Sequence, residues 1–152
     1  MFASLFSSSS SSVEASRRSV GFDDVLLAIQ NPEKYLLINT LPVNQQACLI
    51  QQTVPVAEEE ALLNRLISAY KHYTQPVIVY GRNCADITVD RKYAQLRNLE
   101  FREVYVYSGG MLEWMLLQDV FGRDEFPTTS HTLDILKFQA DSVFKMPRLT
   151  NS

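Results

Sequence analysis

Apolar residues along this chain recur at two different spacings. Phe22, Val25, Leu26 and Ile29 stand three or four positions apart, which predicts a short amphipathic helix that ends before Pro32. A second helix is expected from Ala57, where three consecutive glutamates favour a helix start electrostatically. Its apolar face comprises Leu62, Leu63, Leu66, Ile67 and Tyr70.

Three short apolar runs are typical of buried strands. They occupy positions 35–39, 76–80 and 103–107 and are rich in β-branched and aromatic residues. Positions 53–56 predict a shorter strand, which Pro55 would confine to an edge or an end of a sheet.

Two more helices are expected in the second half of the chain. One follows Thr88, which could cap it, and the other covers positions 111–117. Strands that alternate with helices predict an α/β fold. We therefore expect a three-layer α/β/α domain with a mostly parallel central sheet.

The domain boundaries follow from composition. Six consecutive serines cannot bury apolar surface, so residues 1–20 predict a disordered tail. The domain is expected over 21–145, followed by a C-terminal tail over 146–152. Arg17 and Arg18, together with the serines, leave an organelle transit peptide open as an alternative.

Composition and charge narrow the classes of function. The chain is 46% hydrophobic and 20% charged, as one globular domain would be, and its net charge of −3 with scattered basic residues disfavours nucleic acid. An apolar run long enough to span a membrane is not present. Cys48 and Cys84 form neither a CxxC motif nor a Cys/His cluster, which predicts no metal site and no cofactor. Reduced thiols in a cytoplasmic protein are the expectation.

Candidate chemistry lies after the strand at 76–80, because open parallel sheets bind ligands beyond the carboxyl ends of their strands. This strand is followed by a polar loop, a helix, the strand at 103–107 and the motif Gly109, Gly110, Met111, Leu112, Glu113, Trp114. The order resembles the active-site half of a rhodanese domain. In that family a cysteine at the end of the strand carries sulfur, and loop amides surround it.

Gly81 occupies the position of the sulfur-carrying cysteine, and glycine has no side chain with which to attack a sulfur donor. Cys84 is the only thiol in the loop that could replace it. Arg82 could steer an anionic donor toward Cys84, whereas Asp86 would raise the pKa of the thiol. The expected substrate or anion-binding loop comprises Gly81, Arg82, Asn83, Ala85, Asp86, Ile87 and Thr88.

Other positions also depart from the family pattern. Many rhodaneses carry Asp-x-Arg at the end of the preceding strand, where this chain has Asn39, Thr40 and Leu41. Positions 49–53 replace the usual His-Ile-Pro-Gly-Ala segment and keep only its isoleucine. These departures favour a degenerate domain.

The rhodanese fold is shared with phosphatases whose loop reads Cys-x5-Arg. Arg91 lies seven residues after Cys84, one too many for that motif. A cysteine-dependent phosphatase therefore ranks third among the possible functions.

The remaining candidates favour structural roles. His72 and His131 are solitary and expected at the surface, and Cys48 is expected in the core. Positions 114–117 form an apolar stretch that we assign to packing.

Two hypotheses remain from the sequence. The chain is a catalytically silent rhodanese-like module that binds an anion or a protein partner, or it is a sulfurtransferase that moves sulfane sulfur from a small anionic donor through Cys84. The loss of Asp-x-Arg and the presence of Asp86 favour the silent module.

Overall fold

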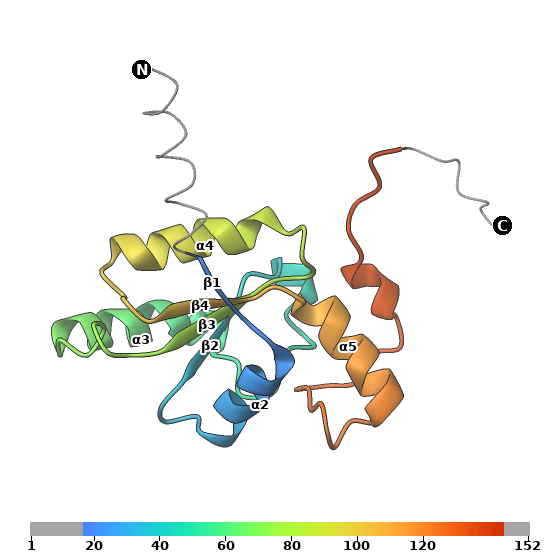
Figure 1. Cartoon of the computed structure of the whole chain (residues 1–152), viewed down its shortest axis with the longest axis horizontal. Helices are drawn as coiled ribbons and strands as arrows, with labels where there is room; N and C mark the ends of the chain where they lie inside the picture. Colours follow the sequence, from blue (N-terminus) through green and yellow to red (C-terminus); the bar gives the residue numbers. More distant parts are fainter. Residues whose placement is uncertain (1–16, 145–152) are drawn as a thin grey trace, which may run out of the picture.

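The computed structural model describes residues 17–144. A sheet of four parallel strands lies between two layers of helices (Figure 1). The strands are β1 (Arg18–Val20), β2 (Leu36–Asn39), β3 (Val77–Tyr80) and β4 (Val104–Tyr107), and their order across the sheet is β1-β4-β3-β2. The helices are α2 (Phe22–Gln30), α3 (Val56–Ser68), α4 (Ile87–Asn98) and α5 (Gly110–Phe121), with short 3-10 turns at Val43–Gln45 (η1) and Ile135–Phe138 (η2). The predicted three-layer α/β/α class is confirmed.

Each central strand contributes alternate residues to two separate hydrophobic cores. Ile78 and Tyr80 of β3 face the core beneath α2 and α5, whereas Val77 and Val79 face the core beneath α3 and α4. Successive side chains of a strand point to opposite faces, so an uninterrupted apolar run is needed where helices cover both sides. This requirement explains why positions 76–80 show no polar alternation.

The strand β1 lies within the segment that the composition predicted to be disordered. Arg18, Ser19 and Val20 pair in parallel register with Tyr105, Val106 and Tyr107 of β4. The guanidinium of Arg18 also lies 3.4 Å from the Glu103 carboxylate. A three-residue edge strand with two polar positions gives no hydrophobic signal, so the sequence pattern could not reveal it.

The predicted strand at 53–56 is wrong. Thr53 makes only an isolated bridge to Leu37, although the amide of Val54 donates to the Leu37 carbonyl at 2.8 Å. Pro55 occupies the N-cap position of α3, without a capping side-chain hydrogen bond, and the helix begins at Val56. Proline has no N–H to donate to a neighbouring strand, but it is well tolerated at the start of a helix. A helix therefore forms here instead of the predicted strand.

The apolar stripe of α3 is shorter than predicted. Leu63 is buried, but Tyr70 follows the end of the helix and is 77% exposed with a positive φ of 55°. The helix ends at Ser68, so the helical spacing on which the prediction depended does not continue to Tyr70.

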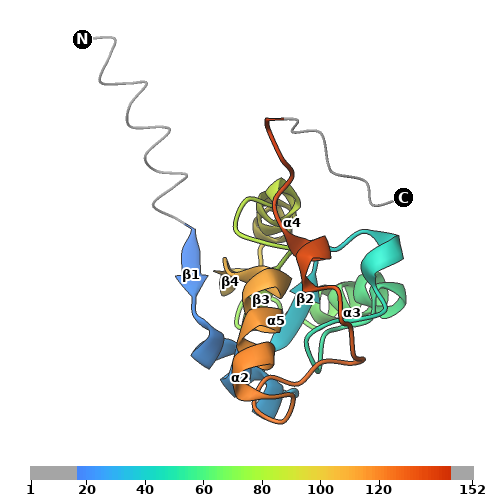
Figure 2. The same ribbon diagram turned by 90° about the vertical axis from the view of Figure 1, so that its right-hand side faces the viewer.

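The helix α5 packs between the sheet and the C-terminal segment (Figure 2). Trp114 is fully buried, contacts Tyr107 and Phe126 edge-on, and donates from Nε1 to the Pro127 carbonyl at 3.2 Å. Met115 is buried as well, which confirms the packing role of these two residues. Leu116 was predicted to pack with them but is half exposed, since a helix on one face of a sheet keeps an outer side.

The two histidines differ in their surroundings. His131 is exposed, as predicted, but the prediction for His72 is wrong, because that side chain is only 3% exposed. Its ring packs against Tyr73 and against Phe101 at centroid distances of 4.1 and 5.7 Å. It serves as an aromatic filler at the end of the core below α3 and α4.

Candidate functional site: the loop between β3 and α4

The loop at residues 81–86 connects the carboxyl end of β3 to α4, where the resemblance placed the sulfur site. The first turn of α5 holds it from the side. Met111 donates from its amide to the Gly81 carbonyl at 2.9 Å, and Leu112 donates to the Arg82 carbonyl at 2.8 Å. The otherwise unpaired amides of a helix N-terminus are thus used to fix the loop.

The Asp86 carboxylate occupies the inside of this loop. One oxygen, Oδ2, accepts a hydrogen bond from the Arg82 amide at 3.0 Å. The other, Oδ1, accepts from the Thr88 amide at 3.1 Å and from the Thr88 hydroxyl at 2.6 Å. Amides that a bound anion would require are therefore already paired with an internal carboxylate.

Asp86 is consequently the N-cap of α4, and the predicted cap at Thr88 is wrong. Thr88 lies in the first turn and donates to the cap instead. Aspartate is a preferred N-cap residue, and its side chain commonly accepts from the amide two residues later. The presence of Asp86 just before the predicted helix was therefore a signal that the sequence already contained.

Hydrogen bonds also set the protonation of Asp86. Its partial burial tends to raise the pKa of the carboxyl, but the Arg82 amide and the Thr88 hydroxyl and amide outweigh burial and hold the pKa below its ordinary value. The group is therefore an anion at neutral pH, in the position where an anionic substrate was expected.

Gly81 has no room for a side chain. A Cβ at this position would lie 2.6 Å from Asp86 Oδ2, 2.6 Å from a methyl group of Val89 and 2.9 Å from the Thr40 hydroxyl. Real Cβ atoms do not approach neighbours so closely. The position that carries a cysteine in rhodaneses is thus filled here by neighbouring side chains, with the carboxylate among them.

Asn83 is buried and ties the loop to the C-terminal segment. Its Nδ2 donates to the Phe138 carbonyl at 2.8 Å, and its Oδ1 accepts from the Ala85 amide at 2.9 Å. The Arg82 guanidinium reaches the same segment, 3.6 Å from the Asp141 carboxylate. A groove of about 490 Å³ remains between Arg82 and residues 134–142.

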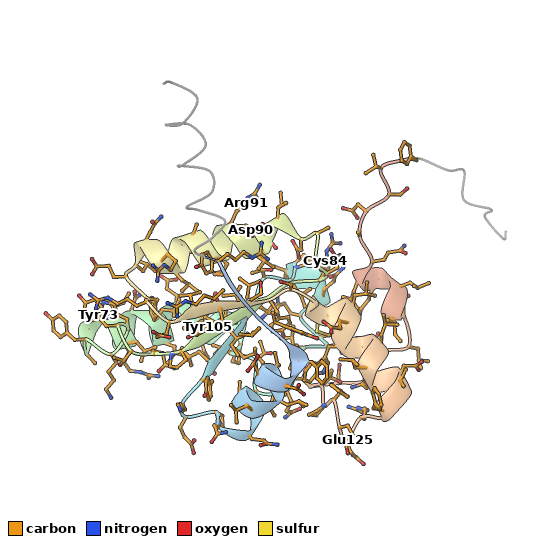
Figure 3. The ribbon with its side chains drawn as sticks, in the orientation of Figure 1. Tyr73, Cys84, Asp90, Arg91, Tyr105 and Glu125 are labelled. Carbon is orange, nitrogen blue, oxygen red and sulfur yellow. The ribbon has the colours of Figure 1, made fainter. Side chains whose placement is uncertain are left out.

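Cys84 lies at the exposed outer side of the loop, at the end of the sheet where α4 and α5 begin (Figure 3). Ala85 and Thr88 give their amides to Asn83 and Asp86, so these donors are not free for a sulfur anion on Cys84. Cys48 is buried, as predicted, with its thiol 3.4 Å from the Ser130 carbonyl, and both cysteines are free thiols.

The two glycines of the Gly109, Gly110 motif are required for different reasons. Gly110 has a positive φ of 62°, and a Cβ there would approach the Gly81 carbonyl oxygen to 2.6 Å. At Gly109 a Cβ would overlap the carboxylate of Glu113, which folds back over it. The motif therefore lets α5 approach the loop closely. Tyr107 lies beside it, and burial together with the Glu113 carboxylate raises the pKa of that phenol.

Arg91 does not join the loop. It lies on α4, with its side chain directed away from Cys84 (Figure 3). It lines a different groove together with Thr40 and Lys92. A phosphatase arginine would have to point into the loop beside the thiol, so this placement disfavours the phosphatase alternative.

Among the described residues, no group of His, Cys, Asp and Glu is arranged as a metal site. Within the same range no helix has the length and apolar character required to cross a membrane.

Comparison with known proteins gives matches among solved structures only. No protein-family model matches the chain, and neither does any curated protein sequence. A full-length protein from Lactobacillus plantarum aligns with 86% of this chain and 100% of its own, at 14% identity and a TM-score of 0.50. A Bacillus halodurans protein aligns at 18% identity over 74% of this chain and 81% of its own (TM-score 0.49). A single-domain sulfurtransferase from Saccharomyces cerevisiae aligns at 17% identity over 73% of this chain and 96% of its own (TM-score 0.48).

At these identities the likeness concerns the fold alone. The predicted order of β3, loop, α4, β4, the two glycines and α5 with Trp114 is present in the structure. The chain therefore has a rhodanese-like α/β fold, with a loop whose interior is occupied by its own carboxylate.

Proposed function

We propose that this chain is a catalytically silent rhodanese-like module that binds a partner rather than transferring sulfur. One observation carries the proposal: Asp86 Oδ2 accepts from the Arg82 amide and lies 2.6 Å from the Cβ position of residue 81. Sulfur transfer requires a thiolate surrounded by hydrogen-bond donors of the loop. Here the Arg82 and Thr88 amides donate to the Asp86 carboxylate instead.

The surface around the loop supports a protein partner over a small anion. Arg82 and Lys137 line the groove below the C-terminal segment, but Asp134 and Asp141 line it too. Interspersed charges of both signs do not concentrate an anion, whereas they suit the polar rim of a protein interface.

A sulfurtransferase that uses Cys84 is the second candidate, and the exposure of that thiol favours it. In this reaction the Cys84 thiolate attacks the outer sulfur of thiosulfate, forms a persulfide and releases sulfite. Atoms and charge are equal on the two sides of this step, so formation of the persulfide needs no other reagent.

Intact mass after incubation with thiosulfate separates the two candidates. For the full chain we expect no gain of a sulfur atom, while an active sulfurtransferase treated in parallel gains one. A gain in the wild type that disappears in Cys84→Ser would overturn catalytic silence and establish the second candidate.

Reconstruction of the sulfur site tests the role of Asp86. The triple variant Gly81→Cys/Asp86→Ala/Val89→Ala removes two of the groups that crowd position 81, and we expect it to gain sulfur from thiosulfate. The matched control replaces Asp86→Ala by Asp90→Ala, an exposed residue paired with Arg17, and should gain none. Equal sulfur uptake by both folded variants would contradict the role assigned to Asp86.

A further inference from the structure

The outward face of α5 carries apolar residues where a surface helix normally carries polar ones. Leu116 and Val120 lie one turn apart on this face and are 50% and 72% exposed. Residues four apart share a side of a helix, so the two form one apolar stripe. The opposite side of α5 is buried in the core through Met111, Trp114 and Met115. A helix that is apolar on both sides is normally covered on both.

A groove of about 230 Å³ adjoins this stripe, between α5 and residues 131–135. The segment with η2 lies beside α5 in both views (Figure 1, Figure 2). Met115 and Ile135 line the groove, and Leu133, which is 88% exposed, belongs to its outer wall. Asp119 lines it from α5, one residue from the stripe. Exposed apolar surface with a polar border is typical of a site where another molecule binds.

The charges around this surface are predominantly negative. Five acidic residues occur between positions 113 and 134, and Arg123 is the one lysine or arginine in that range. Asp119, Asp124 and Asp134 are exposed and form no ion pair within residues 17–144. The surface therefore favours a partner with positive charge.

The C-terminal end of α5 adds to this negative potential. A helix C-terminus carries a partial negative charge, which a lysine or arginine in the last turn commonly offsets. The last turn of α5 has no basic residue and contains Asp119 instead. Glu125 follows in the turn beyond the end of the helix (Figure 3). A cation supplied by another molecule would be stabilised at this end.

These observations select the kind of molecule that fits. A second copy of the chain would bring the same acidic residues to the interface, and like charges disfavour that pairing. The surface is built by a helix and by a segment with a 3-10 turn, so no open strand edge is available for a partner to extend the sheet. A stripe of side chains one turn apart matches the apolar face of another helix.

We propose that α5 and residues 131–136 form a docking surface for an amphipathic helix of a partner protein, with lysines or arginines beside its apolar face. Apolar side chains of that helix pack on Leu116 and Val120 and enter the groove beside Leu133. Its basic side chains pair with Asp119 and Asp134. The inference rests on the proposed partner-binding role of the chain, but no thiol and no residue of the loop at 81–86 takes part.

Fluorescence anisotropy of a labelled synthetic peptide, measured with the full chain, tests the proposal. The probe carries leucines at helical spacing on one face and lysines elsewhere. We expect it to bind at least about tenfold more tightly than a peptide of the same residues in scrambled order, and than one with glutamate in place of lysine. Higher salt should weaken binding, because surface ion pairs are screened. Equal binding of all three peptides, or binding of none, would overturn the proposal.

Two apolar substitutions locate the surface. Val120→Ser and Leu133→Ser change exposed side chains, so the fold should be retained. Each should weaken binding of the probe about tenfold, as expected when one apolar side chain is lost from an interface. Val43→Ser is the matched control, because Val43 belongs to η1, is 89% exposed and does not line the groove. If Val43→Ser weakened binding as much as Val120→Ser, the surface would be wrongly assigned.

The variant Asp119→Asn/Asp134→Asn separates binding from stability. Loss of a negative charge in the last turn of α5 should not lower the free energy of unfolding, because that charge opposes the helix dipole. Binding of the probe should nevertheless weaken at least about threefold and depend less on salt. Asp90→Asn, on α4, is the control and should bind as the wild type does. Wild-type affinity and salt dependence in the double variant would contradict the charge pairing.

Sedimentation of the full chain distinguishes a partner from a second copy. We expect a monomer at the concentrations used for binding. A dimer that Val120→Ser dissociates would assign the surface to a second copy and overturn the proposal. Neither outcome affects the mass measurement with thiosulfate, so catalytic silence is judged separately.

Discussion

One carboxylate oxygen of Asp86 lies 2.6 Å from the point that a Cβ on Gly81 would take. Because the folded chain holds the pKa of Asp86 below the value of about 3.9 for a free aspartate, ionisation of this group stabilises the fold. That stabilisation is fully present above the unfolded pKa and is lost as the pH falls through the folded pKa.

We therefore expect the wild type to exceed Asp86→Asn in free energy of unfolding at pH 6, with the difference narrowing below about pH 4. Urea denaturation across this range measures the effect. Asp90→Asn, at an exposed ion pair, is the control and should show a smaller dependence. A difference between wild type and Asp86→Asn that does not change with pH would contradict the assignment.

Gly110→Ala should destabilise the chain strongly. The positive φ alone costs about 1–2 kcal/mol for a residue with a Cβ, and contacts with backbone atoms of Gly81, Arg82 and Asn83 add to this. We expect a loss of more than about 2 kcal/mol in the free energy of unfolding. Gly21→Ala is the control, because its φ is −95° and a Cβ at that position meets no atom within 4 Å. Similar losses for both variants would argue against the close approach of α5 to the loop.

Tyr80→Phe tests a buried hydrogen-bond network below the loop. The Tyr80 hydroxyl accepts from the Ile50 amide at 3.2 Å and lies 2.7 Å from the Thr53 hydroxyl. Removal of this oxygen leaves the Ile50 N–H buried without a partner, which costs about 1–3 kcal/mol. Tyr73→Phe removes a hydroxyl that donates to Glu100 near the surface and should cost well under half as much. Chemical denaturation compares the two, and equal effects would contradict a structural role for the network.

Asn83→Asp should release the C-terminal segment. The substitution keeps the oxygen that accepts from Ala85 but turns the second group into an acceptor facing the Phe138 carbonyl. Loss of this buried hydrogen bond costs about 1–3 kcal/mol, so trypsin should cleave after Lys137 about tenfold faster. Asp141→Asn affects only an exposed ion pair with Arg82 and should leave the rate nearly unchanged. Unchanged cleavage of Asn83→Asp would show that Asn83 does not hold the segment.

Much of the fold could be predicted because its signals are local. The run at 76–80 is apolar at every position since both faces of β3 are covered, and the glutamates of α3 do mark the start of a helix. β1 and the burial of His72 could not be predicted. Both depend on contacts with residues far along the chain, Tyr105 for β1 and Phe101 for His72.

The sequence by itself determined the order of the four helices and of β2, β3 and β4, the α/β class and the substitution of glycine for cysteine at position 81. Only the tertiary structure decided what fills the space so created, because the answer depends on where the loop brings the Asp86 carboxylate. The same holds for Asn39, whose residue type is visible in the sequence. Its unused donor appears only when the Leu41 amide and Gln46 fix the orientation of the side-chain amide group. Spacing along a chain predicts local periodicity, whereas hydrogen-bond partners are decided by distances between segments that meet on folding.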